Sequence, residues 1–386
     1  MKKKNEISER TSVHLDFIRG VAALSVMAGH VRGLFFADFS NVLHQTVIVR
    51  ILYAVTGFGH QAVVVFFVLS GYFIGTSVCE SVDGHSWSWR IYLVNRLTRL
   101  ELVLFPALIL GAVCDHIGLK LPQAASFYYG GLYKYYEPSV ALRSTVPAFF
   151  GNLLFLQGIR SPVFGSNGPL WSLSYEFWYY ILFPLLMLAA ASWAGIRRIV
   201  YLAFFLILLW FVGTQIRFYF LIWLAGVLVG RVHHMARLRS SGALTLITMV
   251  TGLLFFGSLA WNRVHPISPE VLSDSMIGFF FAVWLYALTL GTREDVAPVY
   301  AKVAKAISGF SYTLYLIHFP MVLLLRGLLD PQGDWQPGPL RLLYGLGIAI
   351  GIFAFAYFLA QITEARTSMV RRSVLRLYAP HFKEVV

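Results

Sequence analysis

The sequence is dominated by apolar segments about as long as a lipid bilayer is thick. A helix needs about 20 residues to cross roughly 30 Å of hydrocarbon. Ten segments come close to that length, at residues 15–36, 58–79, 97–117, 170–190, 197–213, 217–233, 243–261, 272–290, 307–328 and 340–362. Only 13% of the residues are charged, whereas soluble domains have roughly 25%. We therefore predict an all-α integral membrane protein with about ten transmembrane helices.

The organisation expected around these spans is simple. A shorter apolar segment, from Val146 to Gln157, is too short to cross and is predicted to be interfacial or re-entrant. We expect a cytoplasmic tail at residues 1–14, a single transmembrane domain at residues 15–362 and a basic cytoplasmic tail at residues 363–386. The Lys-rich start resembles a signal peptide. However, the apolar segment runs on to Phe36 without a small-x-small cleavage site, which favours an uncleaved first span.

The basic residues indicate the topology. The formal net charge is +13, and Lys and Arg accumulate on the cytoplasmic side of membrane proteins. With the N-terminus inside, most of the 31 Lys and Arg residues fall in inner segments, so both termini are predicted to be cytoplasmic. This placement in short loops explains the basic excess without a nucleic-acid partner.

Arg19 and His30 are costly side chains within the first span, because an ionisable group at membrane depth costs at least ~2.5 kcal/mol on insertion scales. At about 100° per residue, their separation of eleven residues gives both the same direction, about 16 Å apart along the axis. Asp16 lies near this stripe, and residues of small or modest size lie between. The stripe predicts a groove for an extended ligand with an anionic end, and a phosphate head with a pantetheine arm has that shape.

Each of these residues also has a plainer interpretation. Arg19 near a helix end can be a snorkelling flank paired with Asp16, and His30 can be a hydrogen-bonded packing histidine. Their shared stripe favours the functional interpretation. Glu176 lies about two turns into the span that begins near Leu170, at nearly the depth of His30. A carboxylate there can orient an imidazole and stabilise its cation, and the alternative is a structural pair with a neighbouring helix.

Further candidates have equally open interpretations. Ser70, followed by Gly71, lines the predicted site or permits close helix packing. Arg96 and Arg99 face one side of a helix at a cytoplasmic entrance, where they bind phosphate or only set the topology. The aromatic run from Phe127 to Tyr136 is a sugar-stacking platform or an interfacial belt.

Four motifs in this order resemble the acyltransferase 3 family of integral membrane acyltransferases. They are Leu15 to Gly20 followed by Gly29-His30, Phe66 to Gly75, Trp171 to Tyr180, and Ser311 to His318. The resemblance covers nearly the whole chain. The chain departs from the family pattern at Phe17 in place of glycine, at a proline displaced to Pro106, and at Glu364-Ala365 in place of Glu-Pro.

The resemblance implies a multi-pass enzyme of the bacterial inner (plasma) membrane. It implies transfer of an acyl group, commonly acetyl, from cytoplasmic acyl-CoA to a hydroxyl of an exopolysaccharide, an O-antigen or another lipid-linked glycan. The expected partners are thus acyl-CoA (acetyl-CoA), a glycan or glycolipid acceptor and membrane lipids, with no nucleic acid and no metal.

Each candidate residue then has an expected role. His30 takes the proton of the acceptor hydroxyl as the hydroxyl attacks the thioester, and Glu176 orients His30. An acyl-enzyme on Ser70 or His30 is a less favoured variant. The expected donor-binding residues are Asp16, Arg19, Ser70, Arg96 and Arg99, and the expected acceptor-binding residues are Asn167, Trp171 and His318.

A transporter is the alternative from another functional class. Many spans with intramembrane ionisable groups also fit a protein that uses Arg19 and His30 as an anion or proton pathway. The sequence contains no inverted repeat and no matching pair of broken helices, which favours the enzyme. At this stage, acetyl and succinyl donors are both open, as is the identity of the acceptor.

Overall fold

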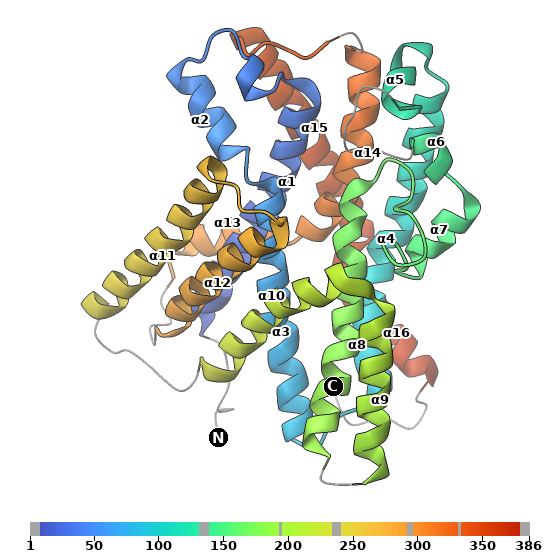
Figure 1. The fold of residues 1–386 in the computed structure, drawn as a ribbon, viewed down its shortest axis with the longest axis vertical. Coiled ribbons are helices and arrows are strands. Elements are labelled where there is room, and N and C mark those ends of the chain that lie inside the picture. Colours follow the sequence, from blue (N-terminus) through green and yellow to red (C-terminus); the bar gives the residue numbers. More distant parts are fainter. Residues whose placement is uncertain are drawn as a thin grey trace. The chain divides into compact units, whose positions relative to one another are not determined.

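The computed structural model describes residues 8–130, 139–192, 195–233, 241–291, 296–330 and 333–378. In these residues the regular secondary structure is helical, and two isolated bridges, Phe36 with Trp335 and Gln157 with Ser161, are the exceptions. Eight helices in the described ranges are long and apolar enough to cross a membrane (Figure 1). The prediction of an all-α membrane fold is confirmed for the described residues. The count of ten spans and the cytoplasmic location of both termini stay predictions.

Every expected span coincides with a helix. These helices are α1 (Glu9–Phe35), α3 (Gly59–Asp83), α4 (Trp89–Leu119), α8 (Trp171–Ala191), α9 (Ile196–Phe211), α10 (Gly213–Val232), α11 (Ser241–Val264), α12 (Glu270–Thr289), α14 (Ser311–Leu329) and α15 (Pro339–Ile362). The helices α1 and α9 are not among the eight long apolar ones. The first carries Arg19 and Arg32 within its apolar stretch, and the second has only 16 residues.

Shorter helices fill the connections. They are α2 (Val47–Val55), α5 (Ala125–Tyr128), α6 (Val140–Arg143), α7 (Val146–Leu153), α13 (Pro298–Ser308) and α16 (Thr367–Tyr378). The helix α7 coincides with the segment predicted to be interfacial or re-entrant, and Thr145 caps it by accepting a hydrogen bond from the Ala148 amide. The helix α16 follows the last expected span and contacts α4.

The chain forms two compact units. The first comprises Met1–Ala22, His60–Trp87 and Tyr175–Ser308, and the second comprises Ala23–Gly59, Ser88–Ser174 and Gly309–Val386. In the first unit, α12 packs against α10 and α11. In the second, α14 packs against α4 and α15 (Figure 1). The helices α1 and α8 contribute residues to both units.

Glycine brings two helices of the first unit into backbone contact. Gly71 and Gly75 are four residues apart in α3, and Gly226 and Gly230 have the same spacing in α10. A Cβ added at Gly71 or Gly226 would overlap a backbone carbonyl of the opposite helix. Small residues at this spacing are typical of closely packed membrane helices. The packing interpretation of Gly71 is therefore confirmed.

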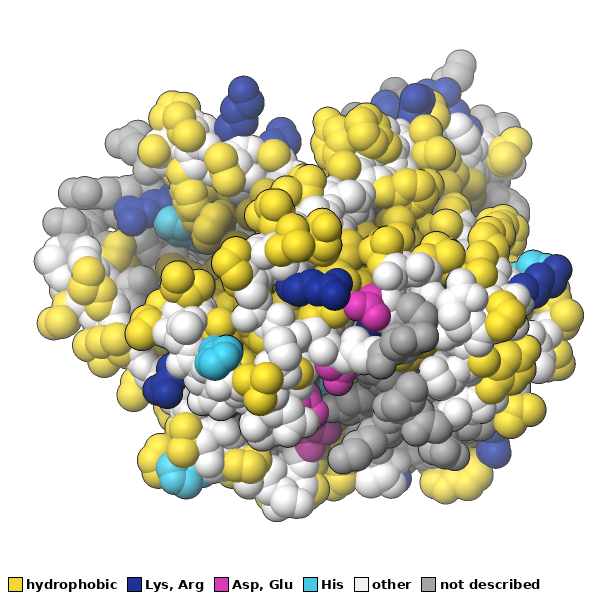
Figure 2. Space-filling model, turned by 90° about the horizontal axis from the view of Figure 1, so that it is seen from above, with side chains coloured by type: hydrophobic (Ala, Val, Ile, Leu, Met, Phe, Trp, Pro, Cys, Tyr) yellow, Lys and Arg dark blue, Asp and Glu magenta, His cyan; other side chains and the backbone are white. Residues whose placement is uncertain are grey.

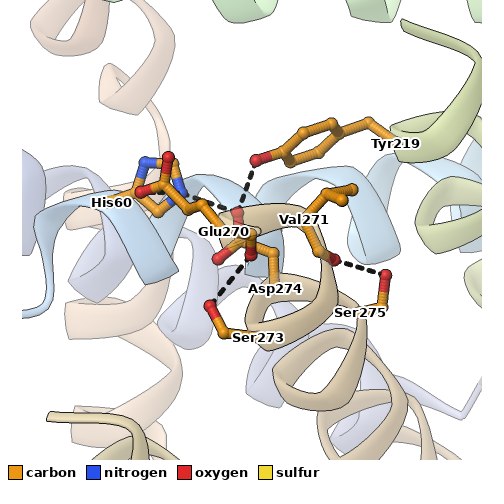
Figure 3. A network of polar contacts seen from close by, with 7 residues as sticks. All are labelled: His60, Tyr219, Glu270, Val271, Ser273, Asp274 and Ser275. Carbon is orange, nitrogen blue, oxygen red and sulfur yellow. Dashed lines mark hydrogen bonds and ion pairs between the residues drawn. The ribbon is translucent and has the colours of Figure 1, made fainter. Parts of the chain in front are cut away.

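A polar network around one buried carboxylate joins three helices of the same unit (Figure 3). Asp274 of α12 is completely buried. Its Oδ2 accepts hydrogen bonds from His60 Nε2 of α3, at 2.7 Å, and from the Tyr219 hydroxyl of α10. Glu270 Oε1 lies 3.5 Å from the same histidine nitrogen. An unpaired carboxylate is costly in an apolar interior. The burial of Asp274 therefore depends on its hydrogen bonds with His60 and Tyr219.

Several helices expose their apolar side chains. In α9, Trp210 is 73% exposed, and in α11 Leu253 is exposed to the same extent. Hydrophobic side chains, drawn in yellow, cover much of the face displayed in Figure 2. Exposed apolar surface of this kind is suited to contact with lipid rather than with water.

The glycine contact predicts a stability difference between two alanine variants. Gly226→Ala forces α3 and α10 apart, and overpacking costs about 1–3 kcal/mol, so its unfolding temperature in detergent is expected to fall by several degrees. Gly257→Ala in α11 is the control, because a Cβ there meets nothing within 4 Å and alanine favours the helix. Equal unfolding temperatures for the two variants would contradict this contact.

The polar network predicts a graded series of variants. Asp274→Ala removes the acceptor shared by His60 and Tyr219, and breaking a buried pair costs about 3–5 kcal/mol. Asp274→Asn keeps one carbonyl acceptor and is expected to lose less. Glu270→Gln is the control, since Glu270 is 72% exposed. The unfolding temperature in detergent should fall most in Asp274→Ala, less in Asp274→Asn and least in Glu270→Gln. An equal fall in Glu270→Gln and Asp274→Ala would contradict the role of Asp274 as the shared acceptor.

Candidate active site

The candidate residues form one polar centre in each unit. The centre of the second unit is a pair of histidines, His30 of α1 and His318 of α14. His30 Nδ1 lies 2.7 Å from His318 Nε2, and the planes of the two rings are inclined by 18° with 5.0 Å between centroids. His30 is partly exposed, whereas His318 is completely buried. The edge of Phe319 packs against His30, with 4.9 Å between ring centroids.

A carboxylate fixes the start of the helix that carries His318. Glu364 Oε2 accepts hydrogen bonds from the Thr313 amide at 3.0 Å and from the Thr313 hydroxyl at 2.9 Å. Thr313 lies in the first turn of α14, where backbone amides lack partners within the helix and a negative charge is favourable. Glu364 belongs to the Glu364-Ala365 departure from the family pattern, and in this chain its carboxylate caps the first turn of α14.

The loop before α8 places Asn167 against α14. Asn167 Nδ2 donates to the Leu316 carbonyl at 2.8 Å. The neighbouring Ser166 amide donates to Asp115 Oδ2 at 2.8 Å, and Gly165 has a φ of +56° with no room for a Cβ beside Asp115. A left-handed backbone without a side chain is what glycine supplies. Asn167 is therefore anchored to the carbonyl of Leu316, which lies two residues before His318 in α14.

The first turn of α8 makes a second link to α14. The Ser172 and Tyr315 hydroxyls lie 2.7 Å apart, and the Tyr315 hydroxyl donates to the Pro169 carbonyl at 3.0 Å. Trp171, one of the residues expected to bind acceptor, begins α8 and is partly exposed. In the second unit, His30 and Asn167 both contact α14, the helix that carries His318. Trp171 directly precedes Ser172, which also contacts α14.

The polar centre of the first unit surrounds Glu176. The Ser70 hydroxyl donates to Glu176 Oε1 at 2.9 Å, and the Tyr180 hydroxyl donates to the same oxygen. Trp223 Nε1 donates to the Ser70 hydroxyl at 3.2 Å. Ser70 is therefore held between an indole donor and a carboxylate acceptor.

Two members of this centre are not candidates in the sequence analysis. Tyr180 lies four residues after Glu176 and thus on the same helix face, which is a signal that could have identified it. Trp223 lies far along the chain, and no motif points to it. Likewise, Asp274 lies within the expected span at residues 272–290, so its intramembrane position alone could have identified it.

Arg19 and Arg96 already have partners within their own units. Arg19 Nη2 lies 3.1 Å from Asp16 Oδ1, and it also donates to the Ser308 carbonyl at 3.3 Å. The side chains of Arg19 and Asp16 are 25% and 30% exposed. The pairing that the plainer interpretation of Arg19 expects is therefore present. Arg96 lies 5.7 Å above the Tyr92 ring, and Arg99 is exposed.

Some expected contacts stay predictions. Glu176 lies in the first unit and His30 in the second, so the orientation of His30 by Glu176 is still a prediction. Of the aromatic run from Phe127 to Tyr136, residues 131–136 lie outside the described residues. Its first two members, Phe127 and Tyr128, are buried, and Tyr129 is 58% exposed.

The second unit also contains a half-open groove of about 630 Å³ along α14 and α15. Its lining is mainly apolar and includes Met321, Leu325, Tyr344 and Ile352. The lining also includes Arg341, whose guanidinium lies 3.4 Å from Asp330 and 4.9 Å above the Trp335 ring. Such a groove fits a hydrocarbon chain with an anionic or polar end.

Comparisons with known proteins identify the family of the chain. A family model described as an acyltransferase domain matches residues 13–361. Acyltransferase MdmB of Streptomyces mycarofaciens is 32% identical over 172 residues, which are 44% of this chain and 37% of that relative. No solved structure matches the chain significantly. Because the family match extends over nearly the whole chain, the protein belongs to the acyltransferase 3 family.

Proposed function

We propose that the protein is a membrane O-acyltransferase. It moves an acyl group, most simply acetyl, from cytoplasmic acetyl-CoA to a hydroxyl of an exopolysaccharide, an O-antigen or another lipid-linked glycan. The observation that carries this proposal is the hydrogen-bonded pair of His30 and His318, at 2.7 Å, on two helices of an apolar bundle. Imidazole is the side chain best suited to accept and return a proton near neutral pH.

In this proposal His30 accepts one proton from the acceptor hydroxyl and later donates it to the leaving CoA sulfur. His30 takes the proton of the acceptor hydroxyl as its oxygen attacks the thioester carbonyl. The new C–O bond forms, the C–S bond breaks, and the imidazolium returns the proton to the CoA sulfur. General-base help of this kind typically contributes 10²–10⁴ in rate.

The donor is held by guanidinium groups in this proposal. Arg19 binds phosphate, because a guanidinium forms paired, charge-assisted hydrogen bonds with phosphate oxygens. Arg96 and Arg99 of the second unit are the other phosphate-binding candidates. Asp16, 3.1 Å from Arg19 Nη2, orients the guanidinium. The acceptor is placed by Asn167 and Trp171.

Two observations refine the proposal. The apolar groove along α14 and α15, with Arg341 in its lining, supports a lipid-linked acceptor over a small soluble one. The hydrogen bond from Ser70 to Glu176 supports a covalent variant in which Ser70 carries the acyl group. We place that variant second, because the Tyr180 hydroxyl also donates to the same carboxylate oxygen and competes with Ser70 for it. Membership of an acyltransferase family counts against the transporter hypothesis.

Replacing the proposed base tests the proposal directly. His30→Ala is expected to lower acyl transfer about 10²- to 10⁴-fold, measured by mass spectrometry of surface glycans and by acyl transfer with the purified protein. His44→Ala is the control, since His44 is exposed, and Ser70→Ala tests the covalent variant. Normal acylation by His30→Ala at normal protein abundance would rule out His30 as the base.

The donor site predicts a change in KM. Arg19→Lys keeps the charge and loses the paired geometry, and a charge-assisted hydrogen bond contributes about 1.5–3 kcal/mol. The KM for acyl-CoA is therefore expected to rise about 10- to 100-fold, with a smaller effect on kcat. Arg50→Lys, at an exposed arginine, should leave both constants unchanged. An unaltered KM in Arg19→Lys would remove Arg19 from the donor site.

A further inference from the structure

We propose that His318 is a positioning residue that fixes the tautomer of His30. It holds the ring hydrogen of neutral His30 on Nδ1, so that the lone pair on Nε2 faces the acceptor hydroxyl. This inference rests on the proposed function, which gives His30 a proton to accept. It assigns to His318 a role other than the substrate contact expected from sequence.

The first step concerns His318 itself. Its Nδ1 lies 3.0 Å from the Leu314 carbonyl, one turn earlier in α14. A carbonyl oxygen only accepts hydrogen bonds, so Nδ1 of His318 carries the hydrogen. In a neutral imidazole the other nitrogen is then an acceptor. His318 Nε2 therefore presents a lone pair.

The second step extends this result to His30. His318 Nε2 lies 2.7 Å from His30 Nδ1. Two lone pairs at that distance would repel each other in a buried site, so His30 Nδ1 carries a hydrogen and donates it. The lone pair of neutral His30 is thus on Nε2. Among the described residues of its unit, the structure gives this nitrogen no hydrogen-bond partner.

The burial of the two rings supports different roles for them. His318 is 0% exposed, and both of its nitrogens have partners, Leu314 and His30. A neutral imidazole has one donor and one acceptor, so His318 has no hydrogen bond left to offer a substrate. His30 is partly exposed and has one nitrogen available.

The arrangement also suits the charged intermediate. When His30 Nε2 takes the acceptor proton, the imidazolium still donates from Nδ1 to His318, so the pair keeps its hydrogen bond. In serine hydrolases a carboxylate holds the base in this way. A neutral histidine performs the positioning without a second buried charge, which is costly at membrane depth.

Three substitutions at His318 separate the two hydrogen bonds. His318→Gln can place its side-chain carbonyl where Nε2 lay, so it retains an acceptor for His30. The shorter side chain of His318→Asn reaches only the position of Nδ1, so this variant keeps the hydrogen bond with Leu314 and loses the one with His30. His318→Ala loses both. We expect kcat to fall about 100-fold in the Asn and Ala variants, with the KM for acyl-CoA unchanged, and to stay within tenfold in the Gln variant.

Nitrogen-15 NMR of histidine-labelled protein in lipid bilayers reports the tautomer without any turnover. The chain has 11 histidines, so the His30 signals are identified by their absence from His30→Ala. We expect a protonated Nδ1 and an unprotonated Nε2 for His30 in the unmodified protein, and a mixture of both tautomers in His318→Asn. Thermal unfolding confirms that each variant is folded.

The outcomes distinguish this inference from the proposed function. A protonated Nε2 on neutral His30 would overturn the inference. So would an inactive His30→Ala combined with a folded, fully active His318→Asn, and in that case the proposed function still stands. A folded His318→Gln that is as inactive as His318→Ala also overturns it. A fully active His30→Ala refutes the proposed base itself, whatever the tautomer.

Discussion

The cost of leaving a polar group unpaired in hydrocarbon governs the arrangement of this protein. Three pairs of intramembrane side chains among the described residues join different helices. His30 pairs with His318, Asp274 with His60, and Ser70 with Glu176. These pairs join segments that are far apart in the chain, so the same contacts that satisfy the polar groups also determine which helices are neighbours.

Backbone contact and polar pairing support each other in the first unit. The absence of a side chain at Gly71 lets α3 approach the Trp223 carbonyl of α10. The indole of the same tryptophan donates to Ser70, the residue before Gly71. Gly71 thus allows the helix approach that brings the Ser70 hydroxyl within hydrogen-bond distance of Trp223. This is why the packing and functional interpretations of Ser70-Gly71 do not exclude each other.

Hydropathy predicts the helices well, because a span of about 20 apolar residues has few alternatives in a bilayer. It also identifies His30, Glu176 and His318 as polar groups in costly positions. It does not identify their partners, since His30 and His318 are 288 residues apart in sequence. Nor does periodicity on one helix reveal that Glu364 caps α14. Pairing depends on helix packing, which a single sequence encodes only through contacts between distant residues.

The cap on α14 has a consequence for biosynthesis. Glu364 lies beyond the last expected span, so the ribosome must complete the whole membrane region before this carboxylate can meet Thr313. The helix that carries His318 therefore acquires its final N-terminal contact late during translation. A chain truncated before Glu364 lacks this contact, so the Thr313 amide and hydroxyl in the first turn of α14 lose their shared acceptor.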